Sequence, residues 1–157
     1  MLRLKVNGFT LIEMIIVVAL LAIFLALAVP NFSSFVRDNR LQAAAGNVRS
    51  LAEFARMEAA TRGGQTNFAI SGSLITVSYN VDLVKKFDLP SGVSISKSAD
   101  STSFSLNGGA SKALALILCE RDDASSAYKV VIERSGRVRV SSRGRDESGK
   151  ALVSCTL

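Results

Sequence analysis

The sequence has no histidine and only two cysteines among its 157 residues. It therefore lacks parts of the Ser/His and Cys/His arrangements of nucleophilic enzymes, and of the common zinc sites. It also has no glycine-rich phosphate loop of the Walker or dinucleotide type. Its tight carboxylate pairs, Asp122-Asp123 and Asp146-Glu147, fit solvated turns better than acid–base chemistry. We predict that the chain is not an enzyme, with no catalytic residues, no metal site and no cofactor.

The two cysteines, Cys119 and Cys155, are 36 positions apart, and each lies at the end of an apolar, strand-like run. In an exported domain, an even pair of cysteines most simply forms one disulfide. Such a bond would tie the last strand to an earlier one and contribute roughly 3–4 kcal/mol in the chain-entropy picture. The alternative is a pair of buried free thiols.

Near the N-terminus, a long apolar run contains a single carboxylate. Residues 9–29 carry no charge except Glu13, and at 1.5 Å per residue they span roughly 31 Å, the thickness of a bilayer core. A short basic leader, residues 1–8, precedes the run, and no small-residue cleavage site follows it as in a secretory signal. A carboxylate within a membrane helix is costly, so we expect Glu13 to have a function.

The residues at this junction read Gly8-Phe9-Thr10-Leu11-Ile12-Glu13. Placed between a basic leader and an apolar helix, they resemble the processing site of type IV pilins and type II secretion pseudopilins. The resemblance implies that a prepilin peptidase cuts between Gly8 and Phe9 and that Phe9 becomes a methylated N-terminus. It also implies that Glu13 pairs with the amino terminus of a neighbouring subunit during assembly. The alternative is a plain membrane anchor with an accidental glutamate.

A helical pattern resumes after Pro30. Apolar residues recur at three- and four-residue steps, which predicts a helix that ends at Arg62 with Gly63-Gly64 as its left-handed cap. Pro30 removes one backbone donor, so we expect it to kink the helix rather than end it. Residues 30–62 would then be an amphipathic continuation of the membrane helix, which resembles the long spine of pilins.

From residue 66 onward, short alternating runs are separated by Gly, Ser, Asn and Asp. They predict strands at residues 67–70, 74–79, 93–97, 103–106, 113–119, 128–133, 137–141 and 152–156. Residues 81–89 are ambiguous between a short helix and a loop. The expected class is α+β, a type IV pilin-like fold in which a long N-terminal helix packs on an antiparallel β-sheet of hairpins. Residues 66–157 would form its C-terminal β-rich domain.

The hairpin around Ser135-Gly136 could adopt two registers. A two-residue loop would put apolar side chains and arginines on the same face of the sheet. A three-residue loop with Gly136 in the left-handed region pairs Glu133 with Arg137 instead and separates the two kinds of side chain. The hydrophobic pattern selects the second register, in which Arg137 and Arg139 project from one face about 6.8 Å apart. Glu133 would then neutralise part of the charge of Arg137.

Excess positive charge is concentrated in residues 129–145. This window has a net charge of +5, whereas the rest of the chain without its leader sums to about −1. Its charged residues are Lys129, Arg134, Arg137, Arg139, Arg143 and Arg145, against Glu133 alone. A charge run on a hairpin is usually a solvated face, and arginines also make subunit contacts in filaments. The alternative is a nucleic-acid contact.

The motif Gly136-Arg137-Val138-Arg139, together with the earlier Phe104-Ser105-Leu106-Asn107-Gly108-Gly109, resembles the GspH/FimT group of minor pilins and pseudopilins, most of all the FimT branch. That resemblance implies DNA binding in natural transformation, carried by Arg137 and Arg139. Arginines without aromatic stacking partners suit sequence-independent, salt-sensitive contacts with the DNA backbone.

The predicted function is a FimT-like minor type IV pilin that binds DNA through this basic hairpin and supports DNA uptake. Two alternatives remain open, a GspH-type minor pseudopilin of a type II secretion system and a structural minor pilin that primes pilus assembly. The other implied partners are further pilins and the prepilin peptidase. The implied location is the inner membrane of a Gram-negative bacterium, crossed once with the domain in the periplasm, and then the pilus.

Overall fold

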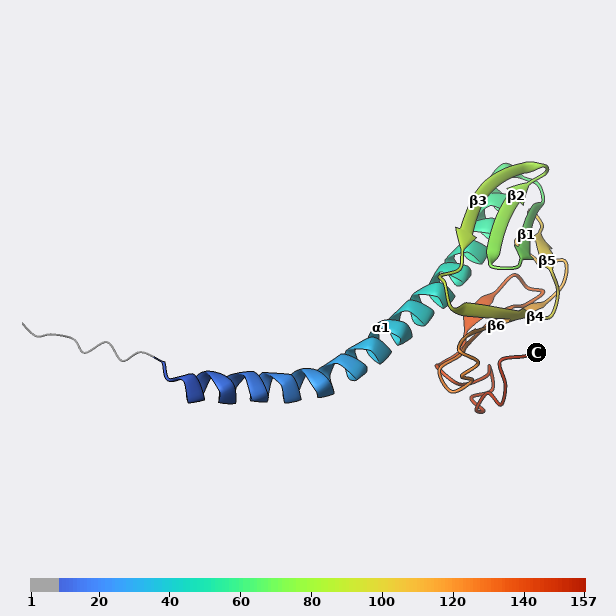
Figure 1. The fold of residues 1–157 in the computed structure, drawn as a ribbon. Coiled ribbons are helices and arrows are strands. Elements are labelled where there is room, and N and C mark those ends of the chain that lie inside the picture. The colour runs from blue at the N-terminus through green and yellow to red at the C-terminus, as the bar shows by residue number, and fades with distance from the viewer. Residues whose placement is uncertain (1–8) are drawn as a thin grey trace, which may run out of the picture. The chain divides into compact units, whose positions relative to one another are not determined.

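The computed structural model describes residues 9–157, except the side chains at positions 30 and 31. The predicted leader, residues 1–8, lies outside the described residues, and so does Gly8 of the proposed cleavage site. The chain divides into two compact units, one that ends at Arg37 and one of Asp38–Leu157. Helix α1 (Leu11–Arg62) runs through both (Figure 1).

Helix α1 begins with a capping interaction. Thr10 precedes its first turn, and the Thr10 Oγ1 accepts a hydrogen bond of 3.3 Å from the backbone N of Glu13. This is one half of a capping box, and it places Glu13 in the first turn, where the helix dipole favours a negative charge. The helix continues past Pro30, as predicted, and the kink expected there stays a prediction.

Helix α1 ends at Arg62, as predicted. Gly63 has a φ of 65°, and the backbone N of Gly64 donates to the carbonyl O of Ala59 at 3.1 Å. These are the left-handed residue and the return hydrogen bond of a glycine C-cap. The cap turns the chain directly into the first strand, whose Thr66 Oγ1 donates to the carbonyl O of Ala55 at 2.6 Å.

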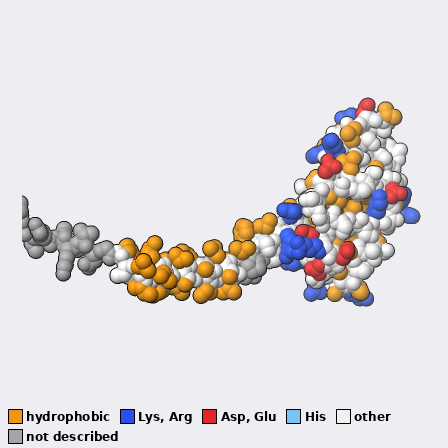
Figure 2. All heavy atoms as spheres, in the orientation of Figure 1, with side chains coloured by type: hydrophobic (Ala, Val, Ile, Leu, Met, Phe, Trp, Pro, Cys, Tyr) orange, Lys and Arg blue, Asp and Glu red, His pale blue; other side chains and the backbone are white. Residues whose placement is uncertain are grey.

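The first half of α1 is apolar on every side. Its large side chains from Leu11 to Val29 are all exposed, and hydrophobic side chains run along this part of the helix (Figure 2). Within the described residues, α1 is the helix long and apolar enough to cross a membrane. A helix that is hydrophobic all round is stable only when lipid or other chains cover it.

Within residues 9–157, the structure has eight strands in two antiparallel sheets of four strands each. They are β1 (Thr66–Ser71), β2 (Leu74–Tyr79), β3 (Asp82–Asp88), β4 (Val93–Lys97), β5 (Ser101–Phe104), β6 (Leu114–Glu120), β7 (Tyr128–Ile132) and β8 (Val138–Val140). The strand orders are β3-β2-β1-β5 and β4-β6-β7-β8. The predicted class, a long helix packed on antiparallel strands, is confirmed, and the strands divide between two sheets.

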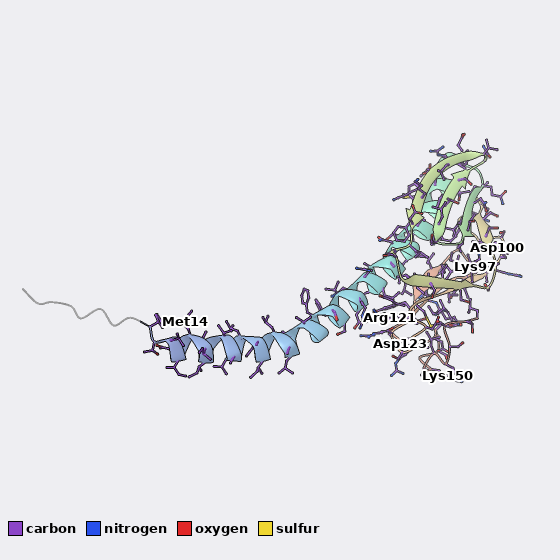
Figure 3. All side chains as sticks on the ribbon, in the orientation of Figure 1. Met14, Lys97, Asp100, Arg121, Asp123 and Lys150 are labelled. Atoms are coloured by element: carbon purple, nitrogen blue, oxygen red, sulfur yellow. A yellow bond between two sulfur atoms is a disulfide. The ribbon has the colours of Figure 1, made fainter. Side chains whose placement is uncertain are left out.

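The chain passes between the sheets at the β4–β5 connection. Strand β4 pairs with β6, whereas β5 returns to pair with β1. Lys97, at the end of β4, forms an ion pair of 2.9 Å with Asp100, and the two side chains lie next to each other (Figure 3). The Lys97 Nζ also donates to the carbonyl O of Ile70 in the other sheet at 2.7 Å. The Lys97 ammonium lowers the pKa of the Asp100 carboxyl, first by donating a hydrogen bond to that carboxylate and then through its charge.

Two sequence-based expectations need correction. Residues 81–89 are neither helix nor loop, because Asp82–Asp88 forms β3 and pairs with β2. Asn80 makes this possible by adopting a φ of 54° in the tight turn between the two strands. Residues 152–156 are not a strand. Only an isolated bridge, Arg145 to Ala151, lies beside this segment in the described structure.

One hydrophobic core joins α1 to both sheets. Alanines on the buried face of α1 allow the strands to approach closely, and Phe68 and Phe104 fill the space between them. The buried members of this core all lie between Leu41 and Val138. The unit of Asp38–Leu157 therefore contains the whole core, and we expect it to fold without residues 1–37.

Candidate nucleic-acid interface

The β7–β8 hairpin has the three-residue loop that the hydrophobic pattern selects. Val131 pairs with Arg139 and Ile132 with Val138. The backbone N of Glu133 donates to the carbonyl O of Arg137 at 2.9 Å, which closes the loop. Val130 and Ile132 are consequently buried in the core, while Arg139 points to solvent from the opposite face.

Gly136 is required at the tip of this hairpin for two reasons. Its φ is 79°, in the left-handed region that favours glycine. In addition, a Cβ at Gly136 would overlap the carbonyl oxygen of Gly108 in the loop between β5 and β6. The side chain of Asn107 shapes that loop by accepting a hydrogen bond of 3.1 Å from the backbone N of Gly109. The two glycine motifs of the sequence therefore contact each other.

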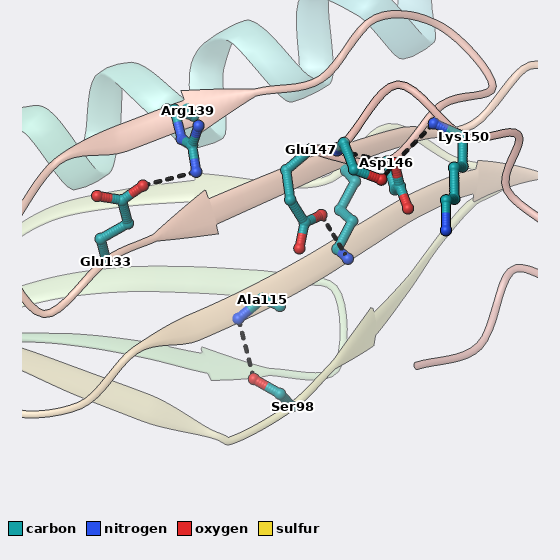
Figure 4. Close-up of polar contacts among 9 residues, drawn as sticks. Ser98, Ala115, Glu133, Arg139, Asp146, Glu147 and Lys150 are labelled. Carbon is teal, nitrogen blue, oxygen red and sulfur yellow. Dashed lines mark hydrogen bonds and ion pairs between the residues drawn. The ribbon is translucent and has the colours of Figure 1, made fainter.

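Two arginines at the tip have uncommitted side chains. Arg134 and Arg137 are exposed, and within the described residues neither guanidinium has a hydrogen bond or an ion pair. Arg139 is 42% exposed and forms an ion pair of 2.7 Å with Glu133 (Figure 4). Glu133 therefore neutralises Arg139, its diagonal neighbour on the same face of the adjacent strand, rather than its backbone partner Arg137.

The other three cations of the window hold the C-terminal segment in place. Lys129 is only 15% exposed and pairs with Glu147 at 2.7 Å (Figure 4). Arg143 makes a two-pronged contact with Asp38 of α1, with N–O distances of 2.8 and 2.9 Å. Arg145 donates from Nη1 to the carbonyl O of Gly149 at 2.7 Å. The sequence window with a net charge of +5 is therefore not one uniform basic surface.

The carboxylate pairs of this region shape turns. The Asp123 carboxylate accepts hydrogen bonds from the backbone N and the hydroxyl of Ser125, at 2.9 and 2.6 Å. The Asp146 carboxylate accepts in the same way from Ser148 and also from the backbone N of Lys150 (Figure 4). The serine hydroxyls lower the pKa of both aspartates, because they bond to the charged form.

A disulfide joins Cys119 of β6 to Cys155, as predicted. Cys119 is fully buried in a small second cluster with Ile117 and Ala127, and Leu152 packs against this cluster. The backbone N of Leu157 donates to Ser96 Oγ at 3.1 Å. The last residues are thus held against the second sheet by a covalent bond, although they form no strand.

Sequence reasoning missed Arg56, an exposed residue of α1. A Cβ atom built on Gly108 would lie 2.8 Å from the Nε of Arg56, and one built on Gly136 would lie 3.2 Å from it. Arg56 therefore sits directly under the tip of the hairpin. No local sequence signal could place it there, because 80 positions separate it from Gly136 and the contact depends on tertiary packing.

Two family models match this sequence. The model of the prokaryotic N-terminal methylation motif matches residues 3–29, and the model described as type II transport protein GspH matches residues 44–136. The second match covers more than half of the chain. The chain belongs to the GspH family. This GspH-family protein combines a pilin methylation motif with the fold of a minor pilin or pseudopilin.

Solved structures agree with this fold. The type IV minor pilin FimU of Pseudomonas aeruginosa (strain PAO1) is similar with a TM-score of 0.64 and 18% identity, over 77% of this chain and 98% of FimU. The minor pseudopilin EpsH of the Vibrio cholerae type II secretion system is similar with a TM-score of 0.57 and 12% identity, over 70% of this chain and 99% of EpsH. No curated protein matches this sequence. At these identities, the likeness shows a shared fold.

Proposed function

We propose that this GspH-family protein is a minor type IV pilin whose apolar helix is held in the inner membrane before assembly. The methylation motif at residues 3–29 supports processing between Gly8 and Phe9. The exposed apolar side chains of the first half of α1 support burial in lipid and later among other pilins. Replacing Gly8 with leucine should leave a full-length precursor in the membrane, detectable by immunoblot. Mature protein of normal size would contradict the cleavage site.

We further propose that the tip of the β7–β8 hairpin binds the DNA backbone and that this contact supports DNA uptake. The observation that carries the proposal is the pair of uncommitted guanidiniums, Arg134 and Arg137, on a rigid turn. Arg139 would join them by exchanging Glu133 for a phosphate, at a smaller net gain. Lys129, Arg143 and Arg145 would contribute mainly by fixing the C-terminal segment, because binding DNA would cost them their present partners.

The expected mode of binding is sequence-independent. Forked guanidiniums can each take a pair of phosphate oxygens, and the hairpin tip, residues 133–137, has no aromatic side chain on which a base could stack. Contacts with two or three phosphates predict that log K falls with log salt at a slope of roughly −2 to −3 on duplex DNA. The domain should accordingly bind at low salt and release DNA well below 1 M salt.

The test is DNA binding by the unit of Asp38–Leu157, titrated across salt with its disulfide intact. The Arg137→Gln/Arg139→Gln variant should bind more weakly on every sequence and with a shallower salt slope. Lys86→Gln/Arg121→Gln is the matched control, because it removes the same charge from two exposed positions away from the hairpin tip, one on β3 and one just after the far end of β6. Equal binding by both variants, or no binding by the unsubstituted domain at low salt, would refute the proposal.

A structural subunit that acts without DNA is the second candidate function. One observation favours it: Arg139, Lys129, Arg143 and Arg145 already have partners inside the domain. This function predicts that the Arg137→Gln/Arg139→Gln variant impairs piliation or secretion, with any effect on transformation secondary. The DNA-binding proposal predicts normal piliation and reduced transformation.

A further inference from the structure

We propose that Arg56 of helix α1 is a third DNA-contacting residue and that the interface spans the helix and the hairpin tip. This inference rests on the proposed function and names a residue outside the basic window of the sequence. We refer to Arg56, Arg134 and Arg137 as the tip cluster. Arg56 is exposed, and within the described part of the chain its guanidinium has neither a hydrogen bond nor an ion pair.

Packing of three backbone segments brings the tip cluster together. The loop at Gly108 lies against Gly136, and the Nε of Arg56 is close to both glycines. Because Gly136 immediately precedes Arg137, the Nε of Arg56 lies close to the backbone from which Arg137 projects. The backbone N of Ala110 donates to the carbonyl O of Arg134 at 2.9 Å, which fixes the hairpin on this loop. The arrangement is therefore built by the fold and not by flexible side chains alone.

The acidic residues beside the tip cluster are engaged elsewhere. Glu53 lies three positions before Arg56 on α1 and forms an ion pair of 2.8 Å with Arg49. Glu133 forms its ion pair with Arg139. The three arginines of the tip cluster thus have no carboxylate partner among the described residues, which raises the positive potential around the tip. An approaching polyanion would neutralise that potential.

A groove beside Arg56 gives a ligand access. It has a volume of about 440 Å³ and is lined by Glu53, Arg56, Met57, Ala60, Leu106, Asn107 and Gly108. Met57 and Leu106 are 56% and 64% exposed, so the groove that Arg56 lines also presents two apolar side chains to solvent. A DNA backbone suits this combination, because its phosphates alternate with sugars that have apolar faces. An acidic segment of a neighbouring pilin is the competing occupant, and the test below separates the two.

The experiment compares Arg56→Gln with Arg40→Gln in the full chain, held in neutral detergent. Both variants remove one exposed arginine from the same helix, but the two positions are 16 residues apart, or about 24 Å along α1. That separation exceeds the Debye length of about 10 Å at 0.1 M salt. Loss of one phosphate contact should make the salt slope of Arg56→Gln shallower by about 0.9. Raising the salt from 50 to 200 mM should therefore weaken DNA binding by the unsubstituted chain about threefold more than it weakens binding by Arg56→Gln.

Arg40→Gln should keep the slope of the unsubstituted chain, and so should Arg56→Lys, which retains the charge and most of the aliphatic stem. A slope for Arg56→Gln equal to that of Arg40→Gln would overturn this inference. If Arg137→Gln/Arg139→Gln still weakened binding, the proposed function would stand without Arg56. If Arg56→Lys has the same shallower salt slope as Arg56→Gln, the effect comes from altered packing and not from a lost phosphate contact. That result would also overturn this inference.

Two further outcomes count against the inference. If Arg56→Gln binds DNA normally and yet fails to enter the pilus, Arg56 belongs to a subunit interface. If the unsubstituted chain does not bind DNA at low salt, the proposed function fails, and the role of Arg56 fails with it.

Discussion

Removing the Cys119–Cys155 disulfide should destabilise the domain by an amount that its loop length sets. The two cysteines are 36 positions apart, and the chain-entropy relation gives about 4 kcal/mol at 25 °C for a loop of that size. Other contacts of the last residues cannot replace this term, because Val153 is 97% exposed and Leu157 is half exposed. The bond therefore supplies much of what keeps this segment on the second sheet.

The assay is urea unfolding of the Asp38–Leu157 unit, with and without a reductant. We expect reduction to lower the free energy of unfolding by about 3–4 kcal/mol, a large fraction of the stability of a small domain. The Cys119→Ala/Cys155→Ala variant should show a similar loss and no response to the reductant. A loss below about 1 kcal/mol in both experiments would contradict the chain-entropy value, since the unfolded chain would then gain little freedom from cleavage of the bond.

Three other predictions follow from single contacts. Glu13→Gln should leave processing intact and reduce incorporation into filaments, measured by immunoblot of sheared pili; normal incorporation would exclude a role for the charge. Gly136→Ala should destabilise the domain by more than about 2 kcal/mol, because its Cβ meets a backbone oxygen, whereas Gly149→Ala, also at positive φ but in open space, should cost only about 1 kcal/mol in urea unfolding. Lys129 lowers the pKa of the Glu147 carboxyl from its usual 4.5, so this ion pair stabilises the fold above that pH and is lost as the pH falls below it. Glu147→Gln should therefore reduce stability near pH 7, and this loss should shrink as the pH falls through the lowered pKa of Glu147; a loss that does not change with pH would contradict this assignment.

The sequence was sufficient where one local pattern decides the structure. The cap at Gly63-Gly64 and the end of α1 at Arg62 follow from the conformational freedom of glycine and from helical spacing. The hairpin register followed because only one pairing buries Val130 and Ile132 together with their partners.

Prediction failed where tertiary contacts outweigh the local pattern. Strand β3 is exposed along most of its length, so its sequence lacks the clean alternation of a half-buried strand, and pairing with β2 decides its conformation. Residues 152–156 alternate like a strand, but they form no ladder of backbone hydrogen bonds with another strand. The disulfide at Cys155 and the backbone hydrogen bonds from Leu152 to Gly144 and from Leu157 to Ser96 hold this segment instead.

The candidate site shows the same limit. Charge counting identified six cations in one window, but it could not show that Lys129, Arg143 and Arg145 contact groups of the domain itself. Asp38, the partner of Arg143, is 105 positions away in the sequence. Long-range pairs of this kind are set by the fold, so a net charge over a window does not define a binding surface.

The most direct test of DNA binding by the hairpin tip compares two double variants within residues 129–145, both measured in the Asp38–Leu157 unit. Arg134→Gln/Arg137→Gln removes the two uncommitted guanidiniums, and Arg143→Gln/Arg145→Gln removes two that are bound within the domain. Both lower the net charge by two. We predict that the first variant loses affinity and that its salt slope becomes shallower by about 1.8, while the second keeps the slope of the unsubstituted domain. Equal effects of the two variants, or a larger effect of the second, would contradict the assignment of DNA binding to the hairpin tip.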